Sequence, residues 1–177
     1  MQMKKAKKTA LCGVSAALSV VLMLITTILP VLMYVLPIVT GLVVLFIYKL
    51  TDKKWAFGVY LSTAFLSMLL LTDKETALTY TLFFGYYPLI RDVIEKLPRA
   101  LSWLVKLLLF NCGAVAIGGL GVLLFGVSGE EYSEFGALTI PVLLGMANVV
   151  FVLYDVMLTK YGVLLLRLTD KFKKFLK

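Results

Sequence analysis

Long apolar stretches alternate with short polar breaks along the whole chain. Most of them approach the roughly 20 apolar residues that an α-helix needs to cross a bilayer. The pattern predicts six transmembrane helices and a basic amphipathic tail, over residues 9–29, 31–49, 55–71, 77–90, 101–125, 137–159 and 160–177. We therefore predict an all-α integral membrane protein whose six helices form a single bundle, with one domain over residues 1–177.

The positive charges gather on one side of this predicted topology. If the N-terminus is cytoplasmic, 17 of the 18 Lys and Arg residues fall in cytoplasmic segments, and Lys74 is the exception. Glu130, Glu131 and Glu134 crowd one outer loop instead. Cytoplasmic segments of membrane proteins carry an excess of Lys and Arg, so we expect both termini on the cytoplasmic side.

Composition excludes several classes of protein. A mean hydropathy of +0.97 and 61% hydrophobic residues are far from those of a water-soluble domain. The pI near 9.5 comes from charges next to the predicted spans, which suit anionic lipid rather than nucleic acid. The chain has no histidine and no P-loop, HExxH or GxSxG motif. We therefore expect no catalytic residue, no metal site and no cofactor, and a protein that is not an enzyme.

A polar cluster is predicted at the inner ends of the last three helices. Asp155 lies about one and a half turns inside its predicted helix, where an isolated carboxylate costs several kcal/mol, so we expect it to pair with Lys106 or Arg91. The cluster is either a charge clamp that fixes the packing of three helices or a proton- or ion-coupled site. Its members are Tyr86, Tyr87, Arg91, Lys106, Asn111 and Asp155.

Further polar and aromatic residues are candidates for binding a small ligand. Asn148 lies in the middle of the last predicted helix, where an amide needs a partner from another helix or from a ligand. Aromatic rings with a few polar groups in the outer half could line a pocket between helices. The candidate substrate-binding residues are Tyr34, Thr79, Tyr80, Glu131, Tyr132 and Asn148.

Small residues recur along one face of the first predicted helix. They are Ala6, Ala10, Gly13 and Ala17. Small residues let a second helix approach closely within a membrane. This face either packs inside the bundle or docks a partner membrane protein. A similar face in the fifth helix, with Ala114, Gly118 and Gly121, is expected to pack internally.

The size, the six helices and the small-residue motifs from Gly13 to Ala17 and from Ala6 to Ala10 resemble the S-components of energy-coupling factor (ECF) transporters. The resemblance implies a membrane-embedded subunit that binds a vitamin-like or other small molecule in the bacterial cytoplasmic membrane. It also implies docking of the first helix to a coupling subunit that carries ATPase subunits, and it makes Asn148 a candidate ligand contact. No signature of the thiamine, riboflavin, biotin or folate branches specifies the substrate.

Two other interpretations stay open at this point. The cell-shape protein MreD is similar in size and helix count, which implies a non-transporting membrane scaffold. Asp155 could instead serve a small proton-linked transporter. The polar residues near Gly85 to Pro88, Leu107 to Asn111 and Asn148 to Asp155 lie mainly towards the cytoplasmic side. S-components bind substrate near the outer face.

Overall fold

The structure, a computed structural model, describes residues 4–125 and 139–175, with side chains over residues 4–120, 123 and 141–162. These residues are helical throughout, apart from short turns. The longer elements are α1 (Lys5–Leu24), α2 (Val35–Leu50), α3 (Lys53–Leu70), α4 (Lys74–Thr79), α5 (Tyr87–Ile94), α6 (Arg99–Phe125) and α7 (Thr139–Phe175). The shorter ones are two 3₁₀ turns, η1 (Ile25–Thr27) and η2 (Pro30–Leu32), and a π-helical turn, η3 (Tyr80–Phe84).

Three helical segments in the described part of the chain are long and apolar enough to cross a membrane. They are Lys5–Thr27, Arg99–Leu120 and Pro141–Gly162, and α2 is a shorter apolar helix. The chain is therefore an all-helical protein with the segments of a membrane protein, as the hydropathy pattern predicts.

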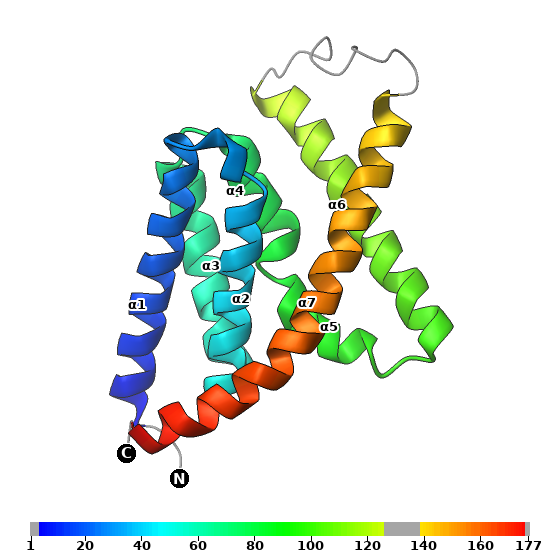
Figure 1. Ribbon diagram of the computed structural model, residues 1–177. Coiled ribbons are helices and arrows are strands. Elements are labelled where there is room, and N and C mark those ends of the chain that lie inside the picture. The colour runs from blue at the N-terminus through cyan, green and yellow to red at the C-terminus, as the bar shows by residue number, and fades with distance from the viewer. Residues whose placement is uncertain (1–3, 126–138, 176–177) are drawn as a thin grey trace.

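The helices run up and down between two ends of the molecule (Figure 1). We call the end where α1 begins and α7 ends the basal end, and the opposite one the apical end. The helices α1, α2 and α3 alternate in direction, and α4, η3 and α5 together return to the basal end. The last two helices, α6 and α7, cross each other, and α7 packs against α2 and ends near the start of α1 (Figure 1).

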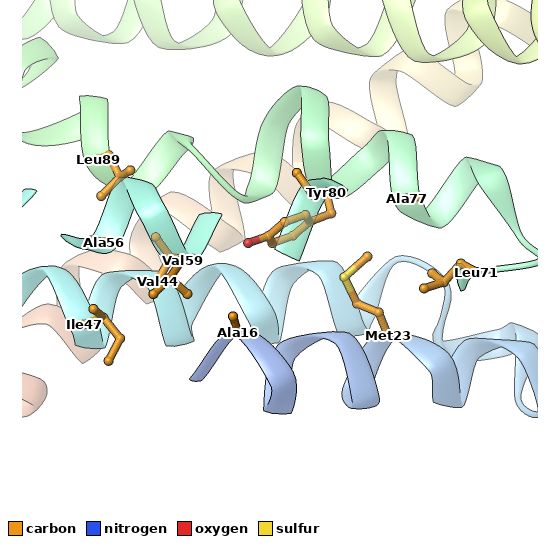
Figure 2. Close-up of a cluster of buried hydrophobic side chains, with 11 residues drawn as sticks. Ala16, Met23, Val44, Ile47, Ala56, Val59, Leu71, Ala77, Tyr80 and Leu89 are labelled. Carbon is orange, nitrogen blue, oxygen red and sulfur yellow. The ribbon is translucent and has the colours of Figure 1, made fainter. Parts of the chain in front are cut away.

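Two clusters of buried side chains form the core. The first lies between α1, α2, α3, α4, η3 and α5, as Figure 2 shows. The second is largely aromatic and joins η3 and α5 to α6 and α7. Its centre is Phe83, whose ring lies 5.0 Å from that of Phe110 and 5.5 Å from that of Phe151. This second cluster positions the basal ends of α6 and α7.

The segment predicted as one helix over residues 77–90 is divided into three elements. Asp73 caps α4 by accepting hydrogen bonds from the backbone N–H groups of Glu75 and Thr76. The helix then widens into η3, where the Gly85 N–H donates to the Tyr80 carbonyl at 2.8 Å. Pro88 cannot donate such a bond, and α5 begins beside it.

Other boundaries also differ from the sequence prediction. The first helix begins at Lys5 instead of residue 9, because the lysines of the basic segment are good helix formers. The second helix begins at Val35 instead of residue 31, because Pro30 opens a 3₁₀ turn. The backbone of α7 continues to Phe175, so most of the predicted tail 160–177 extends the last helix. The predicted fourth helix ends at residue 90, but α5 continues to Ile94.

Candidate functional site

Asp155 is the centre of a buried polar cluster near the basal end. It lies on α7 with only 3% of its surface exposed. Its Oδ1 atom accepts hydrogen bonds from the Tyr87 hydroxyl at 2.6 Å and from Arg91 Nε at 2.8 Å. Its Oδ2 atom accepts from Lys106 Nζ at 2.9 Å. The carboxylate therefore joins α5, α6 and α7. It pairs with Arg91 and with Lys106, the two cations that the sequence suggested as its partners.

A second acid and a hydroxyl complete this arrangement. Arg91 also donates to Glu95, at 2.5 Å, and to the hydroxyl of Thr159, at 2.6 Å. Lys106 lies 3.2 Å from the same Glu95 carboxylate. Two cations thus face two carboxylates, so their charges balance. This is the arrangement expected of a charge clamp, because a buried charge is tolerated when it is paired and hydrogen-bonded.

A cavity of about 430 Å³ opens beside this cluster, lined by the segment that joins α5 to α6, by the first turns of α6 and by the middle of α7. Asp155 and Lys106 are both nearly buried and form its polar wall. We call it the basal cavity. Its lining residues are Glu95, Leu97, Arg99, Ser102, Trp103, Lys106, Asp155, Val156 and Thr159.

The sequence predicts Asn111 and Tyr86 in the inner cluster, but both lie outside it. Asn111 and Asn148 form a reciprocal pair of amide hydrogen bonds, both 3.0 Å long. This pair joins α6 to α7 next to the stacked rings of Phe110 and Phe151, whose centroids are 4.8 Å apart. Tyr86 is half-buried and packs against the ring of Tyr60 instead. Asn148 therefore has a helix partner for its amide.

The candidate substrate-binding residues have separate neighbours. The Tyr34 hydroxyl donates to Glu75 at 2.7 Å. Tyr80 is fully buried, with its ring 6.1 Å from that of Tyr60, and Thr79 is buried next to it. Asn148 is hydrogen-bonded to Asn111 on α6. The described candidate residues therefore do not line a single site. Glu131 and Tyr132 lie outside the described residues.

The small-residue face of α1 is exposed. Ala6, Ala10, Gly13 and Ala17 are all exposed, and a Cβ atom added at Gly13 would meet nothing within 4 Å. The buried face of the helix is formed by other residues, namely Ser15, Ala16, Ser19, Val20 and Met23.

The comparable face of α6 also differs from its prediction. Gly118 is exposed and a Cβ atom added there would meet nothing within 4 Å, so the expectation of internal packing is wrong at this residue. Ala114 is half-buried, and Gly121 lies outside the residues whose surroundings are described. Small residues therefore mark an open face on α6 as well as on α1.

An ion pair outside the candidate spans ties α2 to α5. Lys49 Nζ lies 2.8 Å from Asp92 Oδ2. Partial burial of Asp92 acts to raise its pKa, but the hydrogen bond and the charge of Lys49, helped by the charge of Arg91, hold that pKa below its ordinary value. This pair fixes the basal end of α2 beside the charge cluster.

Several residues at the basal end did not stand out in the sequence. Glu95, Arg99, Ser102, Trp103 and Thr159 all line the basal cavity. Helical spacing could have found two of them, because Glu95 follows Arg91 by four residues and Thr159 follows Asp155 by four. The remaining three lie on the first turns of α6, and nothing in the sequence relates these turns to α7.

No group of three or more Cys, Asp or Glu side chains in the described residues could hold a metal ion. Comparisons of the chain with models of protein families, with curated proteins and with solved structures find no match.

Proposed function

We propose that the chain is the membrane-embedded, substrate-binding subunit of an ECF-type importer for a vitamin-like or other small molecule. It crosses the bacterial cytoplasmic membrane six times, with both termini in the cytoplasm. The three long apolar helices and the one-sided distribution of Lys and Arg support this topology. In it, the basal end faces the cytoplasm, and the remaining passes are α2, α3 and the segment from α4 through η3 to residue 90, which ends before Asp92.

The exposed face of small residues on α1 is the observation that carries this proposal. The described part of the chain leaves this face exposed, and it places nothing within 4 Å of a Cβ atom added at Gly13. Apolar side chains would be equally soluble in lipid at these positions, so small residues there favour close contact with another helix. The coupling subunit of an ECF complex is such a partner.

The docking claim can be tested by co-purification. The double variant Gly13→Leu/Ala17→Leu, tagged and co-expressed with the coupling and ATPase subunits of the same genome, should recover at least tenfold less coupling subunit. Bulky side chains would hold the partner helix away from α1. The variant should keep the thermal unfolding midpoint of the wild type, because nothing inside the chain touches Gly13.

Gly118→Leu is the matched control. Gly118 is also exposed, with nothing within 4 Å of an added Cβ, but it lies on α6. Its variant should recover the coupling subunit in full. Full recovery with the α1 variant as well would contradict docking through this face.

The candidates for contact with a substrate that enters from the apical side are still Tyr34, Thr79, Tyr80 and Asn148, with Glu131 and Tyr132 from the outer loop, although the described ones lie apart in this structure. Tyr80 supports this placement, because it begins η3, and π-helical turns are frequent at functional sites.

A non-transporting scaffold of MreD type is the second candidate. The basal cavity and its charged wall favour this candidate, because in the proposed topology they face the cytoplasm. A scaffold would co-purify with cytoplasmic or membrane partners but without ATPases. A proton-linked transporter using Asp155 has weaker support, since this carboxylate already accepts hydrogen bonds from Tyr87, Arg91 and Lys106. Proton-dependent transport that is lost in Asp155→Asn would favour that transporter.

A further inference from the structure

The first turns of α6 direct unused hydrogen-bond donors towards the basal cavity. Arg99, Ser102 and Trp103 all line it. Ser102 is only 6% exposed, yet its hydroxyl makes no hydrogen bond within the described part of the chain. The indole N–H of Trp103 and the guanidinium of Arg99 have no hydrogen-bond partner there either. Buried polar side chains in proteins are usually paired, so the nearly buried Ser102, with the half-buried Trp103 and the exposed Arg99 beside it, indicates a ligand that supplies acceptors.

The charge balance of the cavity favours an anion. Arg91 and Lys106 are offset by Asp155 and Glu95, which they contact directly. Arg99 is exposed and pairs with no carboxylate of the described residues. Arg91 does not line the cavity, but it contacts both carboxylates. When it is counted with the lining residues, Arg99 is one uncompensated positive charge among donors, which suits a singly charged group with several acceptor oxygens.

The surroundings of these donors favour a lipid as the source of that group. Leu97 and Val156 line the same cavity and are 38% and 40% exposed. Tryptophan commonly lies at the level of lipid headgroups, and basic pockets between transmembrane helices on the cytoplasmic side bind phosphate-bearing headgroups. A volume of about 430 Å³ is sufficient for a headgroup.

We propose that the basal cavity binds the phosphodiester headgroup of an anionic phospholipid. Its phosphate oxygens accept hydrogen bonds from Arg99, Ser102 and Trp103, while the acyl chains leave the cavity past Leu97 and Val156. The lipid then lies against the charge clamp and wedges the basal halves of α6 and α7 at a set separation. This site does not depend on the proposed import function.

The test is native mass spectrometry of the full chain in mild detergent with added dioleoyl phosphatidylglycerol. Arg99→Ala should bind this lipid about fivefold more weakly than the wild type, as expected for the loss of one cation near a headgroup. Ser102→Ala, which removes a single hydroxyl, should weaken binding in the same direction. Both variants should keep the wild-type unfolding midpoint without lipid, which separates lost binding from lost folding.

Lys96→Ala is the matched control, because Lys96 is an exposed cation three residues before Arg99 and does not line the cavity. Its lipid binding should stay within twofold of the wild type. Equal weakening by Lys96→Ala and Arg99→Ala would overturn the site, because the lipid would then respond only to overall charge.

A parallel series with inorganic phosphate identifies the source. Arg99-dependent lipid binding that phosphate does not displace supports the headgroup, and Arg99-dependent binding of phosphate alone would overturn the lipid proposal in favour of the free ion.

Discussion

At the scale of single residues, Asp155 is the position on which the most interactions depend. Its carboxylate accepts hydrogen bonds from three side chains, and two of these carry positive charge. The pairing itself contributes little net stability, because burying all of these charges is costly. Removing the Asp155 carboxylate is costly, because Arg91 and Lys106 would stay buried without this partner.

Asp155→Ala should therefore destabilise the protein by about 3 kcal/mol or more. The measurement is thermal or denaturant unfolding of the purified protein in mild detergent, followed by tryptophan fluorescence. Asp52→Ala is the control. Asp52 also pairs with a lysine, Lys8, but its side chain is 60% exposed, so its loss should cost less than about 1 kcal/mol. Similar losses for both variants would show that the buried cluster is no clamp.

At the scale of elements, the contact between α2 and η3 depends on a glycine. A Cβ atom at Gly41 would lie 2.6 Å from the carbonyl oxygen of Phe84 and 2.5 Å from the hydroxyl of Tyr154. That hydroxyl donates to the same carbonyl at 3.2 Å. Pro88, four residues after Phe84, has no N–H to donate to this carbonyl, so a side chain does so, and Gly41 lets α2 pass close to it.

Gly41→Ala should destabilise the protein by about 1–3 kcal/mol, because a backbone atom cannot move aside without shifting a helix. Gly58→Ala provides the comparison. Gly58 lies within α3 with nothing near an added Cβ, so alanine there should be neutral or stabilising by up to about 1 kcal/mol. Unfolding midpoints of the two variants check both expectations, and a Gly41 variant as stable as the wild type would contradict the close contact.

The ion pair between α2 and α5 predicts a pH dependence. The pKa of Asp92 is lower in the folded protein than its ordinary value. Its stabilising effect is therefore complete above the unfolded pKa, about 3.9, and is lost as the pH falls through the lower folded pKa. Lys49→Met removes the cation that lowers this pKa, so the variant should be less stable at pH 7.

The stabilities of the wild type and of Lys49→Met should converge as the pH falls below about 4, where the Asp92 carboxyl group becomes protonated in both. Unfolding midpoints measured from pH 7 to pH 3 in the same detergent test this. A difference that stays constant over the whole range would show that Lys49 acts through packing alone.

At the scale of the whole molecule, hydropathy predicted the helical membrane fold because long apolar segments have few other solutions in a bilayer. The sequence also placed Arg91, Lys106 and Asp155 together, because charges inside spans need partners. It could not predict the division around η3, which depends on the fit of Gly41 and Gly85 to their neighbours. Nor could it place Asn111 with Asn148 or gather the cavity residues, since these contacts depend on how α6 crosses α7.

The charge clamp also has a consequence for the synthesis of the chain. Arg91 and Lys106 leave the ribosome well before Asp155, and until α7 enters the bilayer only Glu95 is available to them. Unpaired cations within a membrane are costly. Insertion of α7 supplies the missing carboxylate, Asp155. A completed chain can therefore pair both cations with it, whereas a chain truncated before α7 cannot.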